Sequence, residues 1–276
     1  MGDFRACRVA DDEELAKNRV DAFEELKKHP FDDAWHRARS ADLSKVKTPL
    51  LTCANWGGQG IHPRGNFNGF TETPADTPKW LEVHGDSHWS VFSNNYGLDL
   101  QKRFFDYWLK GEKNGWDKQP PVQLNVRHPG EKFVLRHENE WPLARTQWTK
   151  FYLKIDREPL PDPDGVEGEL VKAPLAKTAS ASYPATTGHG HNPAGGITLD
   201  TPVLTEDVEV TGPIVLNIWV SSSSEDCDIY ATIRNIGPDG KDVVEAGQRG
   251  EPQPGVTKGW LRASHRKLDA EKSLPY

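Results

Sequence analysis

His88 is the residue whose type and position point most directly to chemistry. It lies in the segment Val83–Trp89, after a predicted strand and before a predicted helix. In open sheets of alternating strands and helices, the reacting groups lie beyond the carboxyl ends of the strands. Because the pKa of histidine is near neutrality, His88 is suited to act as a general base; packing beside Trp89 is the structural alternative. His84, inside the same strand, is predicted to be structural.

Ser87 stands next to this histidine but does not fit a nucleophile. The strand-to-helix turn that presents a nucleophilic serine reads G-x-S-x-G, and here the bulky Trp89 takes the place of the last glycine. Neighbouring side chains on an extended segment also point apart, which separates Ser87 from His88. No G-x-S-x-G occurs elsewhere in the sequence. The sequence therefore predicts a site histidine without its serine.

Two further motifs resemble ligand-binding sequences, but each lacks residues that such a site requires. His189 and His191 form an H-x-H pair of the kind that chelates one metal ion, but no acidic residue follows before Asp200. The run Asn55–Gly60 lacks the spacing and the lysine of a phosphate-binding loop and is typical of a tight turn. We therefore expect no metal and no cofactor, and rank a metal-dependent cupin last.

The first part of the chain has a pattern that would position His88 at the edge of a sheet. Helical periodicity alternates with short apolar runs that end in turn residues, which predicts βα units on a parallel sheet. The predicted helices cover residues 11–29, 64–71 and 98–110, the last of them ended by Gly111, and the predicted strands cover residues 46–54 and 79–84.

Beyond residue 115 the helical periodicity disappears and short apolar runs alternate with turns rich in proline and glycine. This pattern is typical of an antiparallel sandwich or jelly roll. Strands are predicted at residues 122–127, 133–135, 150–155, 214–220 and 228–235, and residues 159–196 are predicted to be mostly loop. The predicted fold class is thus α/β followed by all-β. Both parts are shorter than complete folds of their kind, so the sequence reads as the middle and back of a longer protein.

The composition excludes several classes of function. With 34 Lys and Arg against 41 Asp and Glu, the net charge is −7, which argues against nucleic-acid binding. The first residues lack the apolar core of a signal peptide, and the apolar runs are too short to cross a membrane. Three widely separated cysteines, Cys7, Cys53 and Cys227, predict reduced thiols in a cytoplasmic protein. The sequence makes no prediction of oligomeric state.

Several segments, in collinear order, resemble one family from about residue 20 to the end. The chain is similar to the CocE/NonD hydrolases, the family of cocaine esterase and X-Pro dipeptidyl-peptidase. The matching segments are Asn55–Gly65, Lys79–His84, Gln101–Asp106, Gly212–Ser222, Glu225–Asp226, Pro238–Gly240 and Gly259–His265. The resemblance implies the back half of an α/β-hydrolase sheet in residues 1–115 and an incomplete jelly roll in residues 116–276.

The same resemblance implies a serine hydrolase that cleaves esters, amides or X-Pro dipeptides through an acyl-enzyme. His88 falls at the position of the family's catalytic histidine, while Gly58 stands where many relatives have the acidic residue, so the acid is unassigned. Asp86 is close in sequence but is not expected to reach the other ring nitrogen. Trp56 and Trp89 are candidates to line the substrate pocket, with core packing as the alternative. A non-catalytic binding module or an inactive remnant is the competing interpretation.

Overall fold

The computed structural model describes the chain except for residues 1–10, 60–61, 156–165, 186–195, 271–272 and 275–276. Two units are distinguished by their internal contacts. One consists of residues 1–139 together with residues 216–275, and the other of residues 140–215. The candidate site lies entirely within the first unit, which is therefore described first.

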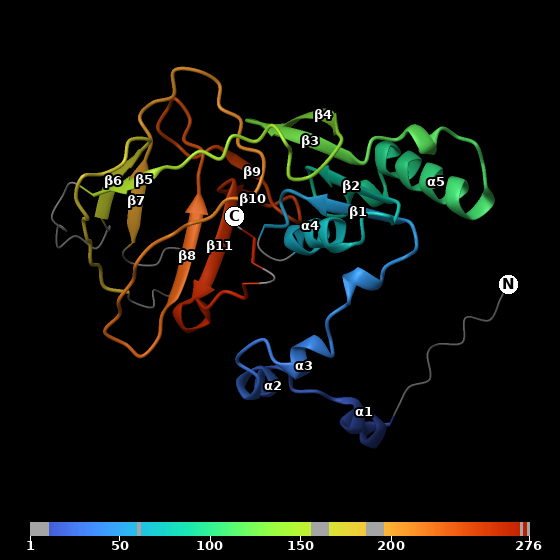
Figure 1. Cartoon of the computed structure of the whole chain (residues 1–276), viewed down its shortest axis with the longest axis horizontal. Helices are drawn as coiled ribbons and strands as arrows, with labels where there is room; N and C mark the ends of the chain where they lie inside the picture. Colours follow the sequence, from blue (N-terminus) through green and yellow to red (C-terminus); the bar gives the residue numbers. More distant parts are fainter. Residues whose placement is uncertain (1–10, 60–61, 156–165, 186–195, 271–272, 275–276) are drawn as a thin grey trace. The chain divides into compact units, whose positions relative to one another are not determined.

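A four-stranded sheet forms the centre of the first unit. Its strands lie side by side in chain order (Figure 1): β1 (Leu50–Asn55), β2 (Lys79–His84), β3 (Val122–His128) and β4 (Lys132–Glu138). β1 pairs with β2 and β2 with β3 in parallel, whereas β3 and β4 form an antiparallel hairpin. The predicted parallel βα units are confirmed. β3 and β4, which the sequence analysis places after residue 115, belong to this sheet.

Helix α5 (Asn95–Lys110) covers one face of the sheet. The Asn94 side chain accepts a hydrogen bond from the Gly97 amide at its start, and Gly111 ends it with a left-handed φ of 71°. The apolar side of the helix builds a buried cluster against the first two strands. That cluster consists of Leu100, Phe104 and Trp116, with Leu51, Trp80, Tyr96 and Tyr107 packed against it.

Helix α4 (Pro63–Glu72) covers the opposite face, and a proline at its first position favours its start. Successive side chains of a strand alternate between faces, so Thr52 points away from the side on which Leu51 packs. The Asn66 amide of α4 donates to the Thr52 hydroxyl at 2.9 Å and to the Cys53 carbonyl at 3.0 Å. The two helices thus leave the carboxyl ends of β1 and β2 between them.

The amino-terminal region contains three short helices, α1 (Asp12–Asn18), α2 (Ala22–Lys28) and α3 (Ala34–Arg37). The single helix predicted over residues 11–29 is wrong. Asp21 has an extended backbone, and its carboxylate accepts hydrogen bonds from the amides of Phe23 and Glu24. Such a capping residue starts a new helix and thereby ends the previous one. Single 3₁₀ turns occur at Leu43–Lys45, Ser90–Phe92, Trp116–Lys118 and Ala263–His265.

The remaining strands of the first unit form two small antiparallel pairs. β8 (Asp228–Ile233) pairs with β11 (Thr257–Arg262), and β9 (Val244–Ala246) pairs with β10 (Pro252–Pro254). The strand predicted at residues 214–220 is not formed, although those residues are described and apolar. Its side chains are largely exposed. A strand needs a hydrogen-bonded neighbour as well as a favourable sequence.

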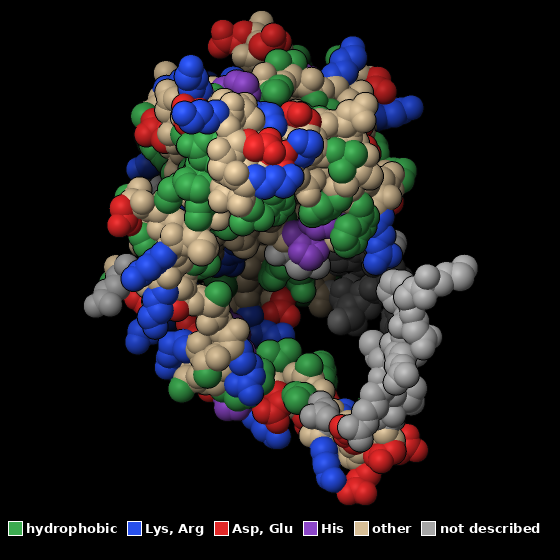
Figure 2. All heavy atoms as spheres, turned by 90° about the vertical axis from the view of Figure 1, so that its right-hand side faces the viewer, with side chains coloured by type: hydrophobic (Ala, Val, Ile, Leu, Met, Phe, Trp, Pro, Cys, Tyr) green, Lys and Arg blue, Asp and Glu red, His purple; other side chains and the backbone are tan. Residues whose placement is uncertain are grey.

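The second unit contains one three-stranded sheet. β5 (Tyr152–Lys154) pairs antiparallel with β6 (Val166–Val171), which pairs in parallel with β7 (Ile197–Asp200). β6 lies inside the segment that was predicted to be loop. The α/β part followed by a β-rich part is confirmed, while the jelly-roll arrangement stays a prediction. Figure 2 shows basic, acidic and apolar side chains interspersed over the face that it presents.

Candidate active site

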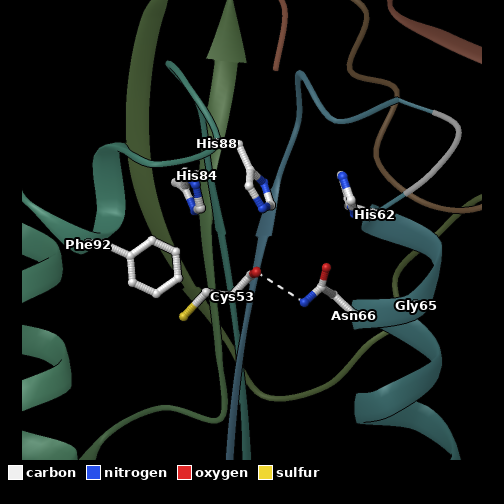
Figure 3. Close-up of a pocket in the computed structure, with 7 residues that line it drawn as sticks. All are labelled: Cys53, His62, Gly65, Asn66, His84, His88 and Phe92. Carbon is white, nitrogen blue, oxygen red and sulfur yellow. Dashed lines mark hydrogen bonds between the residues drawn. The ribbon is translucent and has the colours of Figure 1, made fainter. Parts of the chain in front are cut away.

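A cavity of about 450 Å³ lies at the carboxyl ends of β1 and β2. This is the edge of the sheet at which the sequence placed the chemistry. Three imidazoles face it from different elements: His62 at the start of α4, His84 at the end of β2, and His88 in the loop that follows (Figure 3). The other lining residues are Cys53, Gly65, Asn66 and Phe92.

The loop that carries His88 is held by hydrogen bonds from two distant parts of the chain. The Asn55 side chain donates to the carbonyls of Gly85 and Asp86 at 3.2 and 2.8 Å. The His88 amide donates to the Gln248 carbonyl at 2.7 Å. This second bond joins the loop to the turn between β9 and β10, so the C-terminal region helps to fix the position of His88.

The His88 ring is half-buried and packed between aromatic neighbours. It stacks on His62 with ring centroids 4.9 Å apart, and it meets Trp89 edge to face at 5.1 Å. Burial lowers the pKa of His88, and the nearby His62 and His84 lower it further because protonated rings repel one another. The ring is therefore neutral at physiological pH, which is the form a general base requires.

Among the residues that the structure describes, no carboxylate is bonded to His88. Its Nδ1 atom is buried and has no hydrogen-bond partner among the described residues. Asp86 therefore makes no hydrogen bond to this ring. The Asp86 backbone has a positive φ of 59°, and its carbonyl accepts a hydrogen bond from the Asn55 side chain. Gly58 belongs to the turn after β1, where its amide donates to the Asn55 carbonyl at 3.1 Å.

A carboxylate–imidazole pair that the sequence analysis did not single out lies beneath the cavity. Glu82 is completely buried in β2, and its Oε2 atom is 2.9 Å from His84 Nδ1. Its Oε1 atom accepts hydrogen bonds from the Asn125 amide at 3.1 Å and the Tyr96 hydroxyl at 3.4 Å. Burial raises the pKa of Glu82, and these polar partners offset part of that effect. The available signal was the spacing Glu-x-His, which puts both side chains on one face of a strand.

The two tryptophans predicted to line a pocket lie outside this cavity's lining. The Trp56 indole donates to the Asn125 carbonyl at 2.8 Å, and its ring packs against Phe67. Trp89 is 63% exposed beside His88. Their role in substrate binding stays a prediction.

The H-x-H pair that resembles a metal-binding motif is not described by the structure. His189 and His191 lie outside the described residues. Within the described ranges, no group of three or more His, Cys, Asp or Glu side chains is arranged to hold a metal ion. Nor does any helix in that part of the chain combine the length and the apolar character needed to cross a bilayer.

Comparison with known proteins identifies the family of this chain. Residues 114–275 match the family model of the X-Pro dipeptidyl-peptidase C-terminal non-catalytic domain. The cocaine esterase of Rhodococcus sp. (strain MB1 Bresler) is 29% identical over 255 residues, which is 78% of this chain and 43% of that protein. The chain thus spans less than half the length of this relative.

Solved structures agree with the sequence match. Two crystal structures of a CocE/NonD family hydrolase from Staphylococcus aureus superpose with TM-scores of 0.70 and 0.74, at 30% and 27% identity. They cover 92% and 95% of this chain, and the chain covers 43% and 45% of theirs. An α/β sheet followed by a β-rich region is thus the fold that this chain shares with the solved CocE/NonD hydrolase structures. The chain belongs to the CocE/NonD hydrolase family and carries its X-Pro dipeptidyl-peptidase C-terminal domain.

Proposed function

We propose that this chain supplies the histidine side of the active site of a serine hydrolase that cleaves esters, amides or X-Pro dipeptidyl bonds. His88 is the general base, and the nucleophilic serine comes from a segment outside this sequence. The observation that carries the proposal is a neutral, half-buried imidazole facing a cavity at the carboxyl ends of two parallel strands. The named relatives, a cocaine esterase and a CocE/NonD hydrolase, support the reaction class.

In the proposed reaction, His88 Nε2 accepts the serine proton as the hydroxyl oxygen attacks the carbonyl carbon of the substrate. The protonated ring then gives that proton to the leaving alcohol or amine, and water repeats the sequence to release the acid. We also propose a catalytic part in residues 1–115 and a jelly-roll part in residues 116–276, with the hairpin of β3 and β4 from the second part completing the central sheet of the first.

The test uses p-nitrophenyl esters and X-Pro anilides. The chain alone is expected to show no turnover. When it is co-expressed with the part of the Staphylococcus aureus hydrolase that it does not match, it is expected to form an active complex. His88→Ala is then expected to lower kcat/KM by at least about a thousandfold. Turnover by the chain alone that disappears with His88→Ala would show that it holds its own nucleophile.

A second function, a non-catalytic binding module, is favoured for the C-terminal region by the description of the family that residues 114–275 match. The same complex distinguishes the two. If His88→Ala leaves its activity unchanged, His88 is a structural residue, and the binding module becomes the better interpretation of this chain.

A further inference from the structure

Two buried ring nitrogens of the cavity have no hydrogen-bond partner in the described part of the chain, and they belong to neighbouring histidines. One is His84 Nε2 and the other is His88 Nδ1. Figure 3 shows both rings beside the cavity, with His88 between His84 and His62. An imidazole nitrogen buried without a hydrogen bond lowers the stability of the folded chain, because it has given up its bond to water. The two nitrogens are not hydrogen-bonded to each other, and one bridging water between them would satisfy both.

We propose that Glu82, His84 and His88 form one hydrogen-bonded chain, in which Glu82 is the acid of the site and acts on His88 through His84. The first link is present, because Glu82 Oε2 lies 2.9 Å from His84 Nδ1. The second link joins the two unpartnered nitrogens. It gives His88 the orienting acceptor that neither Gly58 nor Asp86 provides. This inference rests on the proposed function for the role of His88, and it assigns Glu82 and His84 as positioning residues.

The charge on Glu82 determines which atom donates in each of these hydrogen bonds. An ionised Glu82 accepts a hydrogen bond from His84 Nδ1–H, so that His84 Nε2 carries a lone pair and accepts, through the bridging water, the hydrogen bond that His88 Nδ1–H donates. His88 Nε2 is then unprotonated and can take a proton from a hydroxyl group. When it does so, the net charge of the three groups changes from −1 to 0, and the buried carboxylate stabilises the imidazolium that forms.

Protonation of Glu82 reverses both hydrogen bonds and leaves a proton on His88 Nε2, where it blocks base catalysis. The balance between the two forms depends on what faces Glu82. Cys53 approaches it from β1, Tyr96 from α5 and Asn125 from β3, and His62 faces the other end of the chain at His88. Burial raises the pKa of Glu82, so the site is expected to be competent only above that raised value.

Histidine tautomers in the 276-residue chain, labelled with ¹⁵N at the rings, test this arrangement without any need for catalysis. At pH 8, both His84 and His88 are expected to carry their proton on Nδ1. Glu82→Gln is expected to lower the titration midpoint of His88 by about half a pH unit or more, because the carboxylate charge is lost. His84→Gln keeps a carbonyl that can accept from His88 Nδ1, and it is expected to preserve the His88 tautomer.

Tyr96→Phe is the matched control, since it removes a different neighbour of Glu82 and leaves both links of the chain. It is expected to leave the tautomer of His88 unchanged. A wild-type His88 protonated on Nε2 at pH 8 would overturn the proposal, even if neither variant folded. So would a His88 midpoint that is the same in the wild type and in Glu82→Gln. An Nδ1–H tautomer in a complex that lacks esterase activity would instead contradict the proposed function alone.

Discussion

The Cys53 thiol shares the cavity with three imidazoles, yet its environment makes it a poor nucleophile. Its sulfur is turned away from the rings (Figure 3), and burial together with the nearby Glu82 carboxyl raises its pKa to about 12. The thiolate is the reactive form of cysteine, and at neutral pH it is almost absent here. Cys53 is therefore not expected to take the place of the proposed nucleophilic serine.

Alkylation with iodoacetamide checks this conclusion. At pH 8, Cys53 in the folded chain is expected to react about a thousandfold more slowly than the same residue in the urea-unfolded chain, because the fraction of thiolate falls with the raised pKa. Peptide mass spectrometry separates Cys53 from the other two cysteines. Similar rates in the folded and unfolded chains would contradict the environment described.

Sequence analysis identified one residue of this site, His88, and missed another, Glu82. The position of His88 followed from one rule, because a histidine after a strand end in an α/β pattern is placed by local sequence. Glu82 appeared as one more polar residue in a short strand. Its buried polar surroundings depend on Tyr96 and Asn125, which come from two other elements and bond to the same carboxylate.

At the scale of elements, two glycines in helices have opposite surroundings. A β-carbon on Gly97 in α5 would lie 1.7 Å from the Val91 carbonyl oxygen, whereas one on Gly69 in α4 would meet nothing within 4 Å. Gly97 thus permits the close contact between α5 and the turn that follows His88. Gly69 has no such contact and only loosens its helix.

Alanine at each position tests this difference. Gly97→Ala is expected to lower the free energy of unfolding by at least about 2 kcal/mol, since backbone has to move. Gly69→Ala is expected to raise it by about 0.5–1 kcal/mol through helix propensity. Urea unfolding followed by tryptophan fluorescence measures both changes. An equal effect of the two substitutions would show that α5 does not pack as closely as described.

Elements with strong local signals were predicted well, and those that depend on distant partners were not. Periodicity and a C-terminal glycine identified α5, and an apolar run with turn residues identified β2, whose bounds agree with the prediction. Residues 214–220 have an equally apolar pattern but form no strand, while β6, with Glu and Gly in its sequence, does pair. Pairing requires a neighbour, and local sequence does not show whether one is present.

At the scale of the whole molecule, the hairpin of β9 and β10 is joined to the sheet by two neighbouring carboxyl groups, the half-buried Glu131 and the buried Glu245. Glu131 accepts a hydrogen bond from the Ala246 amide at 2.5 Å, and Arg127 lies 3.8 Å from the buried Glu245. Burial and the neighbouring Glu131 raise the pKa of Glu245 to about 7, and Arg127 offsets part of this rise. The folded chain thus favours a protonated Glu245.

A dependence of stability on pH follows. The contribution of Glu245 is fully present below its unfolded pKa, near 4.5, and is lost as the pH rises through about 7. Glu245→Gln keeps the neutral shape at every pH. Relative to the wild type, its free energy of unfolding is therefore expected to rise between pH 5 and pH 8 by on the order of 1 kcal/mol.

Urea midpoints at the two pH values measure this change, with Glu72→Gln, at an exposed carboxylate of α4, as the control. A difference between Glu245→Gln and the wild type that is the same at both pH values would show that Glu245 ionises as an ordinary surface carboxylate.

The turn after β1 lies close to the same hairpin at Gly57. A β-carbon on Gly57 would lie 2.7 Å from the Ala246 carbonyl oxygen. Together with the bond from His88 to Gln248, this contact means that the loop of the catalytic candidate is built from residues about 160 positions apart. Recombination after β3 would transfer the histidines of the cavity without the turn between β9 and β10, to which the His88 loop is bonded. The smallest stretch that relatives can exchange while keeping this pocket intact therefore runs from β1 to β10.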